Sequence, residues 1–189
     1  MKGMLFLIIL ALLSFNAQAA WVLNNAQSSV NFVSIKKSTV AEVHHFTSLK
    51  GALTGDEASV TIDLSSVETA IAVRNERMRR MLFNVVEFPL AQIDAGLDGS
   101  RLMHLGEGDS YQASVLLTLS LHGVKKEISS DVQVVKLSDD RVLVSSVRPV
   151  LLKASDFKLG AGIEALRDVA GLTVISTVVP VSFNLIFQK

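Results

Sequence analysis

Apolar and polar residues alternate along short segments of this chain, and this alternation dominates the sequence pattern. The longest such segment runs from Tyr111 to His122, and another runs from Ser59 to Val67. In the longest one the apolar positions are Val115, Leu117, Leu119 and Leu121. A period of two residues is typical of a half-buried antiparallel strand, because successive side chains of a strand point to opposite faces. The pattern therefore predicts a protein made mainly of antiparallel strands.

Eight segments carry this pattern: Ser28–Lys36, Val40–Leu49, Ser59–Val67, Leu90–Leu97, Tyr111–His122, Ile128–Leu137, Arg141–Lys153 and Val178–Phe187. Pro149 suggests an edge or bulge in the seventh, because proline has no backbone N–H. We expect a loop over Asp98–Asp109 and a short helix over Ile163–Ala170. Short connections favour closure, which removes exposed edges. The predicted fold is all-β, an eight-stranded antiparallel barrel with one or two short helices, and its interior can hold one slender apolar ligand.

The stretch from Ser65 to Pro89 departs from the alternation. It is densely charged, and Arg74, Arg77 and Arg80 recur at a spacing of three residues, which predicts a helix. One interpretation is a solvated helix face partly paired with Glu76. The other is a set of guanidinium groups at the barrel mouth, which contact the polar head of a ligand or a membrane surface. For that second interpretation we select Arg74 and Arg77 as ligand-binding candidates.

The N-terminal residues have the pattern of a secretory signal peptide. Lys2 precedes an apolar run over Met4–Leu13, and small residues flank Gln18 in Ala17-Gln18-Ala19. The run is too short to cross a bilayer, so a membrane anchor is disfavoured. We expect cleavage after Ala19, which makes residues 1–19 the signal peptide and residues 20–189 one exported barrel domain.

Charge and cysteine content narrow the choice of partners. The full chain has 18 basic and 18 acidic residues, so removing Lys2 leaves 17 − 18 = −1. Such a chain lacks the basic field that nucleic-acid binding requires, and we expect no nucleic acid partner. The chain also lacks cysteine, so its stability must come from an apolar core rather than from disulfides. The sequence leaves open whether the chain forms a homodimer.

The histidines are the main candidates for metal or acid–base chemistry. They are His44, His45, His104 and His122. Adjacent residues on a strand point to opposite faces, so His44 and His45 cannot both ligate one ion, and neither H-x-H nor H-E-x-x-H occurs. We therefore predict no structural metal.

Other motifs for catalysis or cofactor binding are weak. The segment from Gly160 to Ala165 matches a dinucleotide fingerprint in its glycines, but the required strand–helix–strand context is missing, and glycine turns explain it. Neither G-x-S-x-G nor cysteine is available as a nucleophile. No pattern places two carboxylates in an apolar cleft. We predict no cofactor and no catalytic constellation, although residues from separate strands can still meet in the fold.

Several short motifs in this order resemble the YceI family of exported proteins. They are Ser29-Val30-Asn31-Phe32, the run from Ile62 to Thr69, the run from Arg74 to Met78, Leu82-Phe83, Phe88-Pro89, the run from Leu121 to Val124, and the run from Ser155 to Leu159. The family's usual Arg-Asp-His-Leu run stands here as Arg74-Asn75-Glu76-Arg77-Met78. The resemblance covers nearly the whole exported part. It implies a lipocalin-like barrel in the periplasm, with an elongated cavity that binds a polyisoprenoid such as a quinone or prenyl lipid.

Three functions follow as hypotheses. The first is non-catalytic binding or carrying of an isoprenoid or other long-chain lipid, with inward-facing apolar side chains as the lining. The candidate lining residues are Phe32, Phe46, Ile62, Leu117, Leu119, Val132, Val144 and Phe183. The second is an enzyme that acts on an apolar substrate inside the barrel, with His122, His44 or His45 as acid or base. The third is a structural or interaction module with a filled core.

Overall fold

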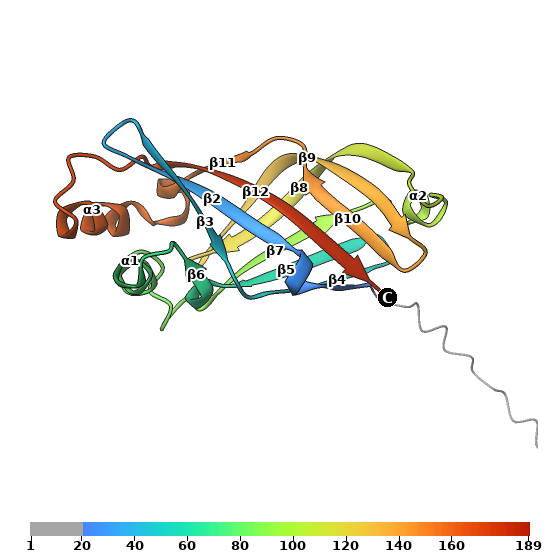
Figure 1. The fold of residues 1–189 in the computed structure, drawn as a ribbon, viewed down its shortest axis with the longest axis horizontal. Coiled ribbons are helices and arrows are strands. Elements are labelled where there is room, and N and C mark those ends of the chain that lie inside the picture. The colour runs from blue at the N-terminus through green and yellow to red at the C-terminus, as the bar shows by residue number, and fades with distance from the viewer. Residues whose placement is uncertain (1–20) are drawn as a thin grey trace, which may run out of the picture.

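A computed structural model describes residues 21–189, so the predicted signal peptide lies outside the described residues. The strands are β1 (Trp21–Leu23), β2 (Ser29–Lys36), β3 (Val40–Phe46), β4 (Leu49–Thr54), β5 (Glu57–Asp63), β6 (Val67–Glu68), β7 (Leu90–Gly96), β8 (Ser110–Leu121), β9 (Val124–Ser138), β10 (Arg141–Ser146), β11 (Val150–Lys153) and β12 (Val178–Gln188). They form one elongated barrel (Figure 1).

Eight of these strands form a closed ring. The order of hydrogen-bonded neighbours is β1-β4-β5-β7-β8-β9-β10-β12, and β12 pairs again with β1 through Val22 and Gln188. Every pair in the ring is antiparallel. The predicted eight-stranded antiparallel, lipocalin-like barrel is therefore confirmed.

Strand β12 is long enough to pair with different strands along its two halves. Its C-terminal half pairs with β10, and its N-terminal half pairs with β11 and with β2, where Val181 lies opposite Phe32. The hairpin of β2 and β3 extends the barrel beyond the ring toward one end. Alternation along β12 points Val179, Val181 and Phe183 into the interior, as the sequence pattern predicts.

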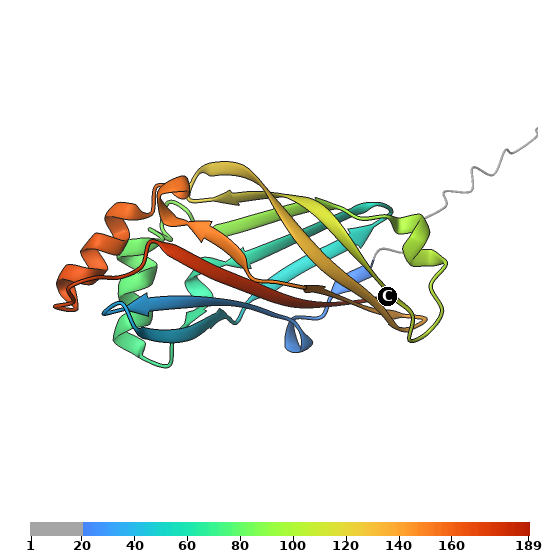
Figure 2. The ribbon, with the colours of Figure 1, turned by 90° about the horizontal axis from the view of Figure 1, so that it is seen from above.

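Short helices cover the two ends. Helix α1 (Ala72–Arg77) continues into a π-helical turn (Met78–Leu82), and α3 (Gly160–Val169) packs against that turn. Helix α2 (Gly99–Met103) lies at the opposite end of the barrel (Figures 1 and 2). Within residues 21–189, none of the helices has both the length and the apolarity that crossing a membrane requires.

Glycine is needed where α3 meets the π-helical turn. A Cβ atom on Gly162 would lie 2.7 Å from the carbonyl oxygen of Met81 and 2.8 Å from the Cα of Leu82. Both neighbours are backbone atoms and cannot rotate away, so only glycine allows this close approach. Gly160 and Gly162 thus lie in a helix at one barrel end, and not in the glycine turns that the sequence analysis expected.

Other boundaries also differ from the sequence prediction. Val40–Leu49 is two strands, because the chain bends at Thr47, whose N–H donates to the carbonyl of Ser66. The predicted loop over Asp98–Asp109 contains α2, which begins where the Asp98 carboxylate accepts a hydrogen bond from the N–H of Arg101. The predicted strand Arg141–Lys153 is broken at residues 147–149, and β1 was not predicted.

Candidate functional site

The barrel encloses an apolar cavity of about 210 Å³. Among its lining residues, all side chains except that of Lys153 are aliphatic or aromatic. Apolar cavities of this kind stay dry and accept apolar molecules, because water inside would find no hydrogen-bond partner. The described structure therefore has an internal cavity, whereas a structural module with a filled core would have none.

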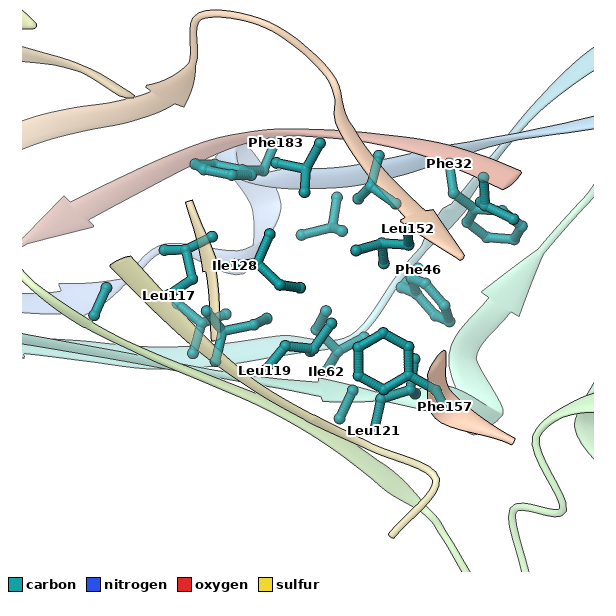
Figure 3. Close-up of a pocket in the computed structure, with 18 of the residues that line it drawn as sticks. Phe32, Phe46, Ile62, Leu117, Leu119, Leu121, Ile128, Leu152, Phe157 and Phe183 are labelled. Atoms are coloured by element: carbon teal, nitrogen blue, oxygen red, sulfur yellow. The ribbon is translucent and has the colours of Figure 1, made fainter. Parts of the chain in front are cut away.

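Eight of the ten predicted site residues lie on this cavity wall. They are Phe32, Phe46, Ile62, Leu117, Leu119, Val132, Val144 and Phe183. The close-up shows the labelled members of this group pointing toward a common space from opposite walls (Figure 3). Strand alternation brings them together, because each occupies an inward position of its strand.

Aromatic rings crowd one end of the cavity. The ring centroids of Phe32 and Phe46 are 5.4 Å apart, and those of Phe46 and Phe83 are 5.9 Å apart. Phe157, which is almost fully buried, comes from the turn after β11 and contributes another ring to the lining. These rings form a continuous aromatic part of the apolar lining.

The cavity has more lining residues than the sequence candidates, and two groups of the additional ones differ in kind from those candidates. One group lies on the helices and turns and includes Leu82, Phe83, Leu159 and Ile163. The other consists of small residues on strands, namely Ala58, Ala91 and Ala95. The period of two along β7 could have identified Ala91 and Ala95, which flank the lining residue Ile93.

Arg74 and Arg77 lie outside the cavity lining. Arg74 donates from Nη1 to Glu42 Oε2 at 2.8 Å and from Nη2 to the carbonyl of Thr69 at 2.6 Å. Glu42 also pairs with Lys36 at 2.6 Å. Arg74 therefore ties α1 to β3 in this structure. Arg77 is partly buried on α1, and Glu76 pairs with Arg79 at 3.5 Å.

Comparison with known proteins identifies the family. The family model described as a YceI-like domain matches residues 21–187. The chain belongs to the YceI family. A search of curated protein sequences found no match.

Several solved structures share this fold. A polyisoprenoid binding domain from Saccharophagus degradans, implicated in plant cell wall breakdown, is 42% identical, with a TM-score of 0.88 over 89% of this chain and 98% of that one. BcnA from Burkholderia cenocepacia is 19% identical, with a TM-score of 0.68 over 87% and 98% of the two chains. The Campylobacter jejuni YceI protein is 17% identical, with a TM-score of 0.56 over 77% and 84%. At these lower identities the likeness shows the fold alone.

The histidines of this YceI-family chain lie outside the cavity lining. His44 is buried and His45 is exposed, as their adjacent positions on a strand predict. His122 is in a turn, with its ring centroid 4.3 Å from that of Phe88, and His104 ends α2. Within residues 21–189, no three His, Asp or Glu side chains are grouped so that they could hold a metal ion.

His44 has the most unusual environment of the four. It is 2% exposed, its Nε2 lies 2.8 Å from Ser34 Oγ, and its ring centroid lies 5.2 Å from that of Phe32. Burial lowers the pKa of His44 below its usual 6.5, and the Arg74 guanidinium lowers it further. The folded protein therefore holds this imidazole in the neutral form under conditions where an exposed histidine begins to take up protons.

We expect the stability of the protein to decrease as the pH is lowered, because of His44. Because the folded pKa is depressed, the unfolded chain takes up the proton first, so stability is complete above about pH 6.5 and declines as pH drops toward the folded pKa. Urea unfolding between pH 7.5 and 5.5 measures this slope. His44→Gln, which can still contact Ser34, should flatten it, whereas His45→Gln should not. An unchanged slope in His44→Gln would contradict the assignment.

Proposed function

We propose that this protein binds an isoprenoid lipid of the quinone or prenyl type inside the barrel and carries it through the periplasm without catalysing a reaction. The observation that carries the proposal is the apolar cavity enclosed by a hydrogen-bonded ring of strands. The 42% identical domain from Saccharophagus degradans, described as polyisoprenoid binding, supports the choice of ligand class. The predicted signal peptide supports the location.

Burial of the lipid tail supplies the binding free energy. Each methylene removed from water contributes about 0.8 kcal/mol, so a few isoprene units outweigh the cost of association with few polar contacts. Because the lining is apolar and follows the length of the barrel, the cavity favours a slender hydrocarbon chain over a compact polar molecule. The ligand would gain affinity from the number of its carbons more than from hydrogen bonds.

The chemistry of the cavity wall supports a carrier over an enzyme. In the described part of the chain, its lining includes neither histidine nor serine nor a carboxylate, and Lys153, its one charged member, has an exposed side chain. A lipid tail held there meets carbon atoms on all sides. The wall thus offers binding without an acid, a base or a nucleophile beside the tail.

The test is to identify what the purified protein contains. The full chain is expressed for export, the protein is purified without detergent, and an organic extract is analysed by mass spectrometry. We expect an isoprenoid lipid in near-stoichiometric amount, which is lacking from extracts of a host that does not express the protein. An empty extract, together with failure to take up added isoprenoid, would overturn the proposal. Conversion of the added lipid to a new product would favour the enzyme instead.

A further inference from the structure

The barrel wall has a seam between β9 and β11. Strand β10 pairs with β9 only as far as Val132, and β11 pairs with β12 alone among the strands of residues 21–189. Residues 147–149, which include Pro149, separate β10 from β11. On this edge of β9 the N–H of Val147 still donates to the carbonyl of Asp131, but within the described residues the edge from Val124 to Ser130 has no strand partner.

A groove of about 410 Å³ lies in this seam, and both inward-facing and outward-facing residues of the wall line it. It is lined by residues 128–131 of β9 and by residues 148–151 of the facing segment. Ile128 and Val150 line both this groove and the internal cavity. Two aliphatic side chains are thus common to the walls of a polar space and of an apolar one.

Ser130 lies in this groove with an unused hydroxyl. Ser130 is 5% exposed, and its Oγ has no hydrogen-bond partner within the described chain. The alternation along β9 places Ser130 on the same face as Ile128 and Val132, which both line the cavity. A buried hydroxyl without a partner is unfavourable, so a polar atom of a ligand at this position would recover that free energy.

The charges around the groove are paired. Asp131 binds Arg148, and it also accepts a hydrogen bond from the hydroxyl of Ser114. Lys126 and Asp156 are 3.3 Å apart and join β9 to the turn after β11. Lys153, at the cavity rim, keeps its ammonium in solvent, where an added anion gains little. The groove therefore suits a neutral polar group better than a phosphate.

We propose that this groove is the head-group subsite, and this inference rests on the proposed function. It holds a neutral oxygen, the hydroxyl of a prenyl alcohol or the carbonyl of a quinone, against Ser130 Oγ. The tail passes between Ile128 and Val150 into the cavity. A hydroxyl can donate to a carbonyl oxygen and can either donate to or accept from an alcohol, so both heads satisfy Ser130.

Binding of probes that differ only in the head group tests this subsite. The probes are farnesol, a quinone with a tail of the same length, farnesyl phosphate, and farnesene, which has no polar head. For Ser130→Ala we expect affinity for farnesol and for the quinone to fall by about three- to tenfold, the size of one neutral hydrogen bond, with farnesene unchanged. Ser59→Ala is the matched control, because Ser59 is an exposed serine on β5 that lines neither the groove nor the cavity.

Several results would overturn the subsite. Ser130→Ala could weaken the binding of farnesol and farnesene equally, or could leave the affinities for farnesol and the quinone unchanged. Either result would show that Ser130 does not contact the ligand. Tighter binding of farnesyl phosphate than of farnesol would refute a neutral head. The lipid-free Ser130→Ala protein should melt at the wild-type temperature or above it, and a lower melting temperature would mean that the hydroxyl already has a partner in the protein. Wild-type protein that binds none of the probes would refute the proposed function itself, whereas intact binding with no effect of Ser130→Ala refutes only the subsite.

Discussion

Replacing Ala91 with phenylalanine is expected to abolish lipid retention while leaving the barrel folded. Ala91 is 3% exposed on β7, opposite Ile62, and it lines the cavity. A phenyl ring at this position points into the space that the lipid tail would occupy. If the ring displaces one isoprene unit of about five carbons, the loss of binding free energy is roughly 4 kcal/mol, which is close to a thousandfold in affinity.

Gln92→Phe is the matched control for this prediction. Gln92 is the next residue on the same strand, is exposed and points away from the cavity, so the same ring is added outside the barrel. Lipid content by mass spectrometry and affinity for an added isoprenoid are measured for both variants, with circular dichroism to confirm folding. Overpacking in Ala91→Phe should cost no more than about 1–3 kcal/mol of stability, because the cavity accepts part of the ring. Retention of lipid at the wild-type level would place the ligand elsewhere.

The strands and most of their lining residues were predictable because alternation fixes both at once. A residue such as Leu119 or Val132 can face inward only if its whole strand does, since a shift by one residue would expose every apolar side chain of that strand. Closure then places all inward faces around one space. This is why Phe32 and Phe183, about 150 residues apart along the sequence, could both be assigned to the same cavity.

The lining residues on helices were not predictable in the same way. Short helices have many orientations on a barrel end, and the one adopted depends on tertiary contacts such as the approach of Gly162 to the backbone of Met81 and Leu82. Leu82 and Ile163 face the cavity only because of that packing. Helical periodicity identifies an apolar face but not the surface that covers it.

The role of Arg74 also depends on contacts that the sequence does not show. The sequence suggested Glu76 as a partner for the arginines of this helix, and Glu76 does pair with Arg79. Arg74 instead binds Glu42, a residue on β3 that is 32 positions earlier in the chain. Ion pairs between separate elements follow from the fold, so local charge spacing could not assign this one.

We expect Asn75→Ala to cost about 3 kcal/mol of folding free energy, a large share of the stability of a single domain. Asn75 is 5% exposed, and its Oδ1 accepts hydrogen bonds from the N–H of Thr69 at 2.9 Å and from Thr69 Oγ1 at 2.5 Å. Its Nδ2 donates to Glu68 Oε2 at 3.0 Å. Alanine would leave the buried N–H of Thr69 without this acceptor and its hydroxyl with only the long 3.4 Å contact to the carbonyl of Ile71. Urea unfolding of the lipid-free protein at pH 7 measures the loss, with Glu76→Ala as the exposed neighbouring control.

Asn75→Asp distinguishes the hydrogen bonds that the Asn75 side chain accepts from the one that it donates. Aspartate keeps an acceptor for Thr69 but puts a carboxylate oxygen against Glu68, where the amide of Asn75 is the main cause that lowers the pKa of Glu68. We expect this variant to be less stable than wild type at pH 7 and to regain stability relative to wild type as pH falls below about 4.5. Protonation of either carboxylate then removes the repulsion in the variant, and wild type loses the benefit of an ionised Glu68. Wild-type stability for Asn75→Asp at pH 7 would show that the bond to Glu68 contributes nothing. A constant deficit at all pH values would assign the loss to shape rather than to charge.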